Sequence, residues 1–550
     1  MRHPNLTKSG PMLKIKPLVI LPPCLLLLPA VILNFVSPDE FAKRLENAYN
    51  AALSGFGWLA SLLALIMLVV CCVVYASPFG RVMIGGPGAK PILKKWNLFA
   101  IVVCVNIGVG ILLWGPIEPL YHFHTPPISL GITPETPAAA TFALSTVYLH
   151  NTVLPLSFAT LVGLMFAFAY YNMRQPFTLG APLAPLMGRH SRGSAGQLID
   201  AVCLYALVAA MAASLGGALL LLGGGINYYF GIHGKPSNFL LGSVCLAIVG
   251  AYTGAAITGL TKGIRILANF KTVLFVLFLA FIFLLGPTQF ILSYAVEGLG
   301  NFLSHFFEKA LFTGAAHDDP WPHKWTQMYM SAWCAWAPLN GLFFGRIAYG
   351  YTVRTYLVFS LLLPAIFMGI WMAIICGATI HLELFEHADL WTVLKTQGDE
   401  RVMYAFMEHF PLVRFITPAF LFVCFISFIT SAAAVTSTMG GLCSTGVSPE
   451  SPEASRFLKI FWGALVGVLA YIMITYARID GIRMLSNLAG VPTLLLCGTV
   501  VVSALVVMLN PSKFDHFKDN YDKDGNPMPD RQTPADPPDT QHEPSTTQPP

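Results

Sequence analysis

Long runs of apolar residues alternate with shorter polar connections along almost the whole chain. A helix needs about 20 predominantly apolar residues to cross the hydrocarbon core of a bilayer, and most of the runs reach that length. The candidate spans are centred near residues 27, 67, 108, 157, 211, 248, 280, 335, 367, 426, 467 and 496. The pattern therefore predicts an all-α polytopic membrane protein with about twelve transmembrane helices.

Two of these spans contain residues that weaken a helix. The run 106–119 holds glycines and prolines, and the stretch SAWCAWAPLNGLFFGR at 331–346 contains Pro338 and Gly341. The two segments lie five spans apart, the separation of corresponding helices in two inverted five-helix repeats. Paired interruptions indicate a binding site near the membrane midplane, because unwound backbone exposes free N–H and C=O groups. The alternative is that glycine and proline only kink two packed helices.

One face of the 331–346 helix carries aromatic rings and an amide at helical spacing: Trp333, Trp336, Asn340 and Phe343. Ring faces attract a cation that has no N–H to donate. Packing of the two indoles in a helix core is the alternative.

Three further segments complete the organisation. The first apolar run, 17–36, follows lysines in the manner of a signal peptide, but its length and lack of a cleavage site indicate an uncleaved span. Residues 291–313 are too polar to span and predict an amphipathic helix on the outer face. The tail from residue 511 is rich in Pro, Asp, Thr and Gln, which predicts disorder.

Composition agrees with the hydropathy pattern. The 550 residues are 55% hydrophobic and 11% charged, whereas soluble domains carry about 25% charged residues. The net charge of +5 is spread over loops and gives no nucleic-acid footprint. Lys and Arg gather in the connections 77–96 and 172–197 and are absent from 121–144, which predicts cytoplasmic termini. The eleven cysteines form no Cys-x-x-Cys pair, and no hydrolase or zinc-protease motif is present, so we expect neither an enzyme nor a cofactor.

Four motifs resemble the betaine/choline/carnitine transporter family: WGPIEPLYH (114–122), GLTKGIRILAN (259–269), WCAWAPLNGLFFGRI (333–347) and FITSA (428–432). The resemblance extends from about residue 50 to 508. It implies a leucine-transporter-like inverted repeat of five plus five helices after two extra N-terminal helices. It also implies a secondary transporter for a small zwitterionic or amine solute, embedded in the bilayer of the bacterial inner membrane and commonly a homotrimer.

Applied to this chain, the resemblance implies six segments: a cytoplasmic N-terminus 1–16, two helices in 17–76, a first repeat 97–290, a periplasmic amphipathic helix 291–313 in the trimer contact, a second repeat 325–508 and a disordered cytoplasmic tail 511–550.

In the family, the rings at the positions of Trp333, Trp336 and Phe343 contribute to a cage around a quaternary ammonium. Span four departs from the pattern, because Asn151 stands where the family has a tryptophan, and two further rings are replaced by Leu156 and Ala159. The amides inside spans are costly without a partner or a role, which makes them substrate-contact candidates: Asn106, Asn151 and Asn340. A structural role at the interruption is the alternative for Asn106. An amino-acid-like substrate is therefore an alternative to a quaternary amine.

The coupling ion also follows from the resemblance. Thr430 and Ser431 match the hydroxyl ligands of the family's sodium position, opposite span-three carbonyls near Cys104 and Ile107. Bonding of both hydroxyls into their own helix is the alternative. A second sodium position is lost to Leu207 and Met211, so sodium symport has ion-independent exchange as its alternative.

Two titratable residues of spans three and four are further candidates. Glu118 is interpreted as a structural or gating carboxylate, with proton carriage as the alternative. His150 is interpreted as a packed residue, with a proton relay as the alternative.

Overall fold

The computed structural model describes residues 15–106, 108–258, 261–445 and 455–528. Within these residues the regular elements are helices, and β-pairing is limited to isolated bridges. Nine helices of this part of the chain are long and apolar enough to cross a membrane, or ten if one bent pair counts as a span. The all-α membrane class is therefore confirmed, whereas twelve spans and the inverted repeat stay predictions. Elements not discussed individually below are α7 (Ala184–Met187), α8 (Ser194–Tyr229), α9 (Asn238–Thr258), α13 (Trp321–Lys324), α15 (Val353–Leu357), α17 (Leu390–Gln397) and α18 (Asp399–Glu408).

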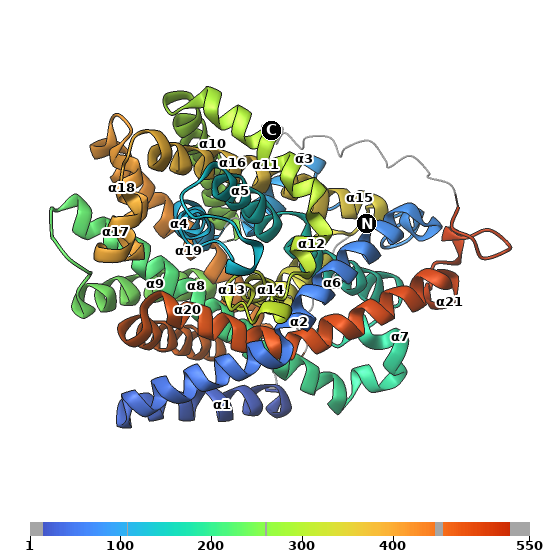
Figure 1. Cartoon of the computed structure of the whole chain (residues 1–550). Helices are drawn as coiled ribbons and strands as arrows, with labels where there is room; N and C mark the ends of the chain where they lie inside the picture. Colours follow the sequence, from blue (N-terminus) through green and yellow to red (C-terminus); the bar gives the residue numbers. More distant parts are fainter. Residues whose placement is uncertain (1–14, 107, 259–260, 446–454, 529–550) are drawn as a thin grey trace, which may run out of the picture.

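Three long helices pack together along one side of the bundle (Figure 1). They are α1 (Pro17–Val36), α2 (Pro38–Ala76) and α20 (Arg456–Leu509). Helix α20 has 54 residues and contains two candidate spans, Arg456–Tyr476 and Arg483–Leu509. The first apolar run is thus part of the packed bundle, since Val19 and Leu27 of α1 are buried.

Span three is interrupted where the sequence predicts it. Helix α3 (Lys95–Asn106) ends before residue 107, which lies outside the described residues, and α4 (Val109–His124) begins directly after Gly108. Gly108 has extended backbone, with φ −83° and ψ 174°. Because α3 and α4 have only 12 and 16 residues, neither alone reaches the length of a membrane span.

Span four is also broken, which the sequence analysis did not predict. Helix α5 (Pro137–Asn151) ends and α6 (Val153–Ala167) begins on either side of Thr152, whose φ and ψ are −114° and −128°. Pro155 lacks an N–H, so the carbonyl four residues earlier, at the end of α5, loses its helical partner. The Thr152 hydroxyl also donates to the carbonyl of Tyr148 (2.6 Å), beside the backbone N–H of Thr152 (3.1 Å), and such hydroxyl contacts bend helices.

Span eight, in contrast, is continuous, and the predicted interruption at Pro338 and Gly341 is wrong. Helix α14 (Thr326–Ile347) runs through both residues. Gly341 serves close packing: a Cβ there would lie 2.6 Å from Cγ1 of Val162 and 3.0 Å from the backbone nitrogen of Gly163 on α6. Small residues at such a crossing let two helix backbones approach within a membrane protein.

The chain turns sharply between α10 (Thr261–Leu285) and α11 (Thr288–Ser304), whose axes differ by 106°. Helix α11 buries Ile291, Tyr294 and Phe302 along one face, against α5 and α16 (Leu363–Phe385). With α12 (Phe306–Leu311) it covers the 291–313 segment predicted to be an amphipathic helix. The one-sided burial agrees with that pattern.

The predicted disorder of the tail 511–550 is wrong for its first part. Helix α21 (Pro511–Phe514) begins a segment that is folded through residue 528, while 529–550 lie outside the described residues. The Asp515 carboxylate accepts hydrogen bonds from Asn172 (2.9 Å), Asn520 (2.9 Å) and Tyr521 (3.0 Å). One buried acceptor thus holds the segment against the end of span four, which polar composition alone does not reveal.

Candidate functional site

The aromatic face of α14 lies where the sequence places it. Trp333, Trp336 and Phe343 are half-buried, although most other residues of α14 are buried. Asn340, on the same face, is 6% exposed. The indole N–H of Trp333 donates to the main-chain carbonyl of His150 in α5 (3.1 Å). One ring of the face is therefore anchored at the end of a broken helix.

The two other intramembrane amides have different surroundings. Asn106 is the last residue of α3, and its amide nitrogen donates to the carbonyl of Val102 one turn earlier (3.0 Å). Its buried oxygen Oδ1 has no hydrogen-bond partner, so a hydrogen-bond acceptor is available at the interruption of span three. Asn151 instead donates to Glu118 (3.3 Å) and to the carbonyl of Val147 (3.0 Å). Its nitrogen is therefore already engaged within the protein.

The predicted sodium hydroxyls lie in α19 (Val413–Leu442). Thr430 donates to the carbonyls of Ile426 and Ser427, both at 3.0 Å, and Ser431 donates to the carbonyl of Ser427 at 3.1 Å. Both hydroxyl hydrogens are thus committed to the helix, while the oxygen lone pairs can still accept. On the span-three side of the predicted site, Cys104 lies in the last turn of α3, whereas Ile107 lies outside the described residues.

A buried carboxylate forms a polar cluster near the aromatic face. Glu118 of α4 is 1% exposed and accepts from four side chains. Oxygen Oε1 accepts hydrogen bonds from Nδ1 of His150 (2.7 Å) and from Nε2 of His122 (3.3 Å). Oxygen Oε2 accepts hydrogen bonds from the hydroxyl of Tyr329 (2.7 Å) and from the amide nitrogen of Asn151 (3.3 Å). We call these five residues the Glu118 cluster.

Three members of the Glu118 cluster offer metal-ligand atoms. One atom each of Glu118, His122 and His150 lies within 4.8 Å of the others. Tetrahedral zinc with bonds of about 2.0–2.1 Å holds neighbouring ligand atoms about 3.3 Å apart. The 2.7 Å between Glu118 and His150 is shorter and matches a charge-assisted hydrogen bond. The cluster therefore fits a bound proton better than a metal ion.

Sequence reasoning missed His122, Tyr329 and Thr326 at this site. Thr326 contributes a hydroxyl 2.9 Å from Nε2 of His150. Two spacings offered a signal: His122 follows Glu118 by four residues, and Tyr329 precedes Trp333 by four, so each pair shares a helix face. No local sequence pattern indicated that α4, α5 and α14 pack together at this site.

Comparison with known proteins identifies the family. The profile of the betaine/carnitine/choline family transporters matches residues 18–513. The chain belongs to this family. The resemblance seen in the four motifs is thereby confirmed, as is the expectation of a transporter rather than an enzyme.

Several relatives in this family carry names that state a solute. A probable glycine betaine transporter of Desulfitobacterium hafniense is 26% identical over 450 residues, covering 82% of this chain and 88% of the relative. The glycine betaine transporter OpuD of Bacillus subtilis is 27% identical and covers 84% and 88%. An ectoine/hydroxyectoine transporter of Virgibacillus pantothenticus is 25% identical and covers 84% and 90%. The family thus includes carriers of different small organic solutes.

Proposed function

We propose that this family member is a secondary active transporter of a small zwitterionic solute of the betaine or ectoine class, driven by sodium across a bacterial inner membrane. The observation that carries the proposal is the half-buried ring face of α14 beside the broken span four. Aromatic faces bind a cationic head that cannot donate hydrogen bonds. The names of the relatives support the same solute class.

The substrate proposal extends to the degree of methylation. Asn151 stands where the family has a ring, and the Oδ1 of Asn106 is a buried acceptor without a partner. A solute that donates hydrogen bonds would satisfy such an acceptor, whereas a fully methylated head would leave it unpaired. Less methylated amines or amino-acid-like zwitterions are therefore the alternative to glycine betaine. Asn340 completes the proposed substrate contacts on the aromatic face.

For sodium, the proposal rests on Thr430 and Ser431. Their hydrogens are donated to α19, which orients the oxygen lone pairs away from those carbonyls and leaves them available to a cation. Carbonyls near Cys104 and Ile107, next to the interruption of span three, would supply the remaining oxygen ligands. Ion-independent exchange remains the alternative mechanism.

We further propose that the protein is a homotrimer with cytoplasmic termini. Helix α11 exposes large apolar side chains at spacings of four, three and four residues: Leu292, Val296, Leu299 and Leu303. Such a stripe suits a contact with a second copy in a homotrimer. The charge pattern favours cytoplasmic termini, and with that orientation the side that carries α11 and α12 would face outward.

Uptake of labelled glycine betaine and ectoine by proteoliposomes tests this function. We expect accumulation with an inward sodium gradient and none after the gradient is dissipated. Accumulation that requires preloading with unlabelled solute, with or without sodium, would establish exchange instead. Vesicles that take up neither solute under any of these conditions would refute the proposed solute class.

A further inference from the structure

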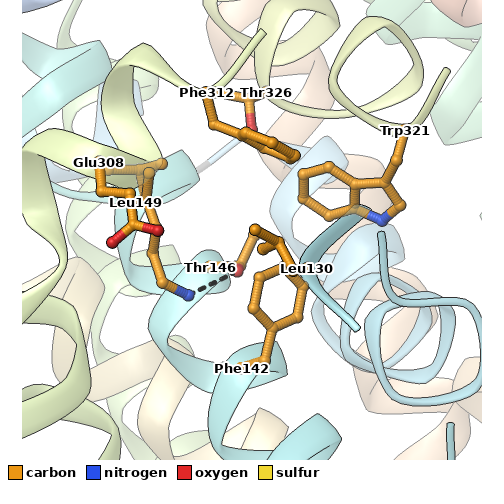
Figure 2. Close-up of a pocket in the computed structure, with 9 residues that line it drawn as sticks. Leu130, Phe142, Thr146, Leu149, Glu308, Phe312, Trp321 and Thr326 are labelled. Atoms are coloured by element: carbon orange, nitrogen blue, oxygen red, sulfur yellow. Dashed lines mark hydrogen bonds between the residues drawn. The ribbon is translucent and has the colours of Figure 1, made fainter. Parts of the chain in front are cut away.

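A small cavity lies beside the Glu118 cluster on the side of the bundle that carries α12. Its volume is about 20 Å³, enough for one water molecule. Figure 2 shows Phe142, Trp321, Phe312 and Thr326 around it. The exposed side chain of Glu308 also lines it, so the cavity reaches the surface.

The wall of the cavity leads into the Glu118 cluster through hydrogen bonds. The hydroxyl of Thr326 is 2.9 Å from Nε2 of His150. The opposite ring nitrogen, Nδ1, is 2.7 Å from Glu118. A hydroxyl can donate and accept at once, and an imidazole can exchange a proton between its two nitrogens. A continuous path for a proton therefore runs from the cavity to a carboxylate that is 1% exposed.

The charges around Glu118 leave room for one proton. An ionised Glu118 accepts from donors that can all be neutral, and a lone charge in a membrane interior is unfavourable. His122 is best kept neutral, because its buried Nδ1 has no hydrogen-bond partner to accept a second ring proton. His150 has a partner at each nitrogen and can hold the extra proton. Other ionisable groups on the helices packed here include Tyr329, Cys376, Lys309, Arg483, Lys395 and Asp399.

Three of these groups are cations with their own partners. Lys395 lies over the rings of Trp391 and Tyr121. Arg483 stacks on the rings of Trp114 and Trp325. Lys309 donates to Ser145 (2.6 Å) and Thr146 (3.2 Å), the latter being the dashed line in Figure 2. None of the three is a donor to the Glu118 carboxylate, which accepts from the four side chains described above.

We propose that Thr326, His150 and Glu118 form a proton-binding site that is filled from this cavity. A water in the cavity donates a proton to the Thr326 oxygen, and the original hydroxyl proton passes to Nε2 of His150. His150 becomes an imidazolium that is paired with the Glu118 carboxylate, and hydroxide returns to solvent. The cluster takes up one proton, and its net charge changes from −1 to zero.

Two features connect the proton-binding site to the parts of the protein proposed to carry transport. Trp333 of the aromatic face bonds to the carbonyl of His150, and the break at Thr152 follows two residues later. Moving an uncompensated charge during alternating access is costly, so the protonated, neutral cluster should reorient faster. This consequence rests on the proposed transport function and orientation, whereas proton binding itself does not.

Proton binding can be measured without any solute. In purified protein with isotope-labelled histidine, nuclear magnetic resonance distinguishes imidazole from imidazolium. As the pH is lowered, we expect one buried histidine to gain its second ring proton, and its signal should be absent from His150→Gln. If all titrating histidine signals survive in His150→Gln, the proposed site is wrong.

Transport supplies the second test, with matched variants. At a fixed sodium gradient and internal pH, lowering the external pH from about 8 to about 6 should speed solute uptake roughly three- to tenfold. Thr326→Val should reduce this response to less than about twofold, and Thr326→Ser should restore it. Thr146→Val is the matched control, since Thr146 lines the same cavity but bonds to Lys309. Lys309→Met should also keep the wild-type response.

The outcomes separate the two proposals. A pH response that persists in Thr326→Val, or one that disappears in Lys309→Met, would overturn the proton site. Absence of all solute uptake would refute the proposed function, and the histidine titration would still decide the proton site.

Discussion

The indole nitrogen of Trp333 lies 3.1 Å from the main-chain oxygen of His150 and donates a hydrogen bond to it. His150 is the next-to-last residue of α5, and its imidazole contacts Glu118. This single bond joins the aromatic face of α14 to a broken helix and to a buried carboxylate. Trp333 therefore differs from Trp336 in a way that the sequence motif does not show.

Tyrosine should replace Trp336 better than leucine, because a ring face is retained. Loss of a cation–π contact costs about 0.5–2 kcal/mol, so Trp336→Leu should bind solute about two- to thirtyfold more weakly. Trp333→Tyr should bind solute about two- to tenfold more weakly than Trp336→Tyr, because the His150 carbonyl loses its hydrogen-bond donor. Equilibrium binding to purified protein measures all three, and equal affinity of Trp336→Leu and wild type would exclude a cation–π contact.

A methylation series tests the proposed preference for hydrogen-bonding solutes. Glycine, sarcosine, dimethylglycine and glycine betaine should compete for uptake with similar strength, or more strongly when fewer methyl groups are present. The physical reason is the unpaired acceptor of Asn106, which a head without N–H groups cannot satisfy. Affinity that climbs steeply with each methyl group would favour a fully caged quaternary amine.

The sodium hydroxyls have an internal control in the same helix. We expect Thr430→Ala combined with Ser431→Ala to abolish stimulation of uptake by sodium. Thr436 donates to the carbonyl of Ala432 (2.8 Å), the same type of bond in α19. Thr436→Ala should therefore leave the sodium dependence intact. Unchanged sodium dependence in the double variant would remove the site from Thr430 and Ser431.

The tail should divide into a structural and a dispensable part. Deleting 520–550 removes Asn520 and Tyr521, and the buried Asp515 carboxylate then loses two donors. An unsatisfied buried acceptor costs about 1–3 kcal/mol, so thermal unfolding in detergent should begin at a lower temperature. Deleting only 529–550 keeps both donors and should leave the unfolding temperature unchanged. Equal stability of the two truncations would contradict the role of Asp515.

Lys309 should make stability depend on pH. Burial lowers the pKa of Lys309 from 10.5 to about 7. Between these values the unfolded chain holds a proton that the folded protein does not, so the free energy of unfolding rises with pH from about 7 to about 10. Lys309→Met removes this contribution, and unfolding temperatures should rise less steeply between about pH 7 and pH 9. A variant with the same pH slope as wild type would show that Lys309 does not titrate there.

Properties set by local composition could be predicted from the sequence alone. Hydropathy decides whether a segment prefers lipid or water, and the first apolar run was accordingly identified as a helix long enough to span a membrane. Helical spacing placed Trp333, Trp336 and Phe343 on one face, because residues three, four or seven apart point the same way. The four motifs led to the correct family.

Tertiary packing decided where proline breaks a helix. Pro155 follows a break at which the Thr152 hydroxyl offers the backbone another bond. Helix α14 continues through Pro338, where Gly341 and Gly163 bring two helices into close contact. Proline removes one donor in both places, but its neighbours determine whether the loss is absorbed or opens the helix.

Tertiary structure also decided the role of Glu118. Its partners His150 and Tyr329 are 32 and 211 residues away along the chain. Sequence indicated a carboxylate near the end of a span and left its role open between structure and proton carriage. Three helices have to meet before a buried carboxylate acquires four donors and a path to a cavity. Such contacts depend on the distance between helices, which no periodicity within one helix contains.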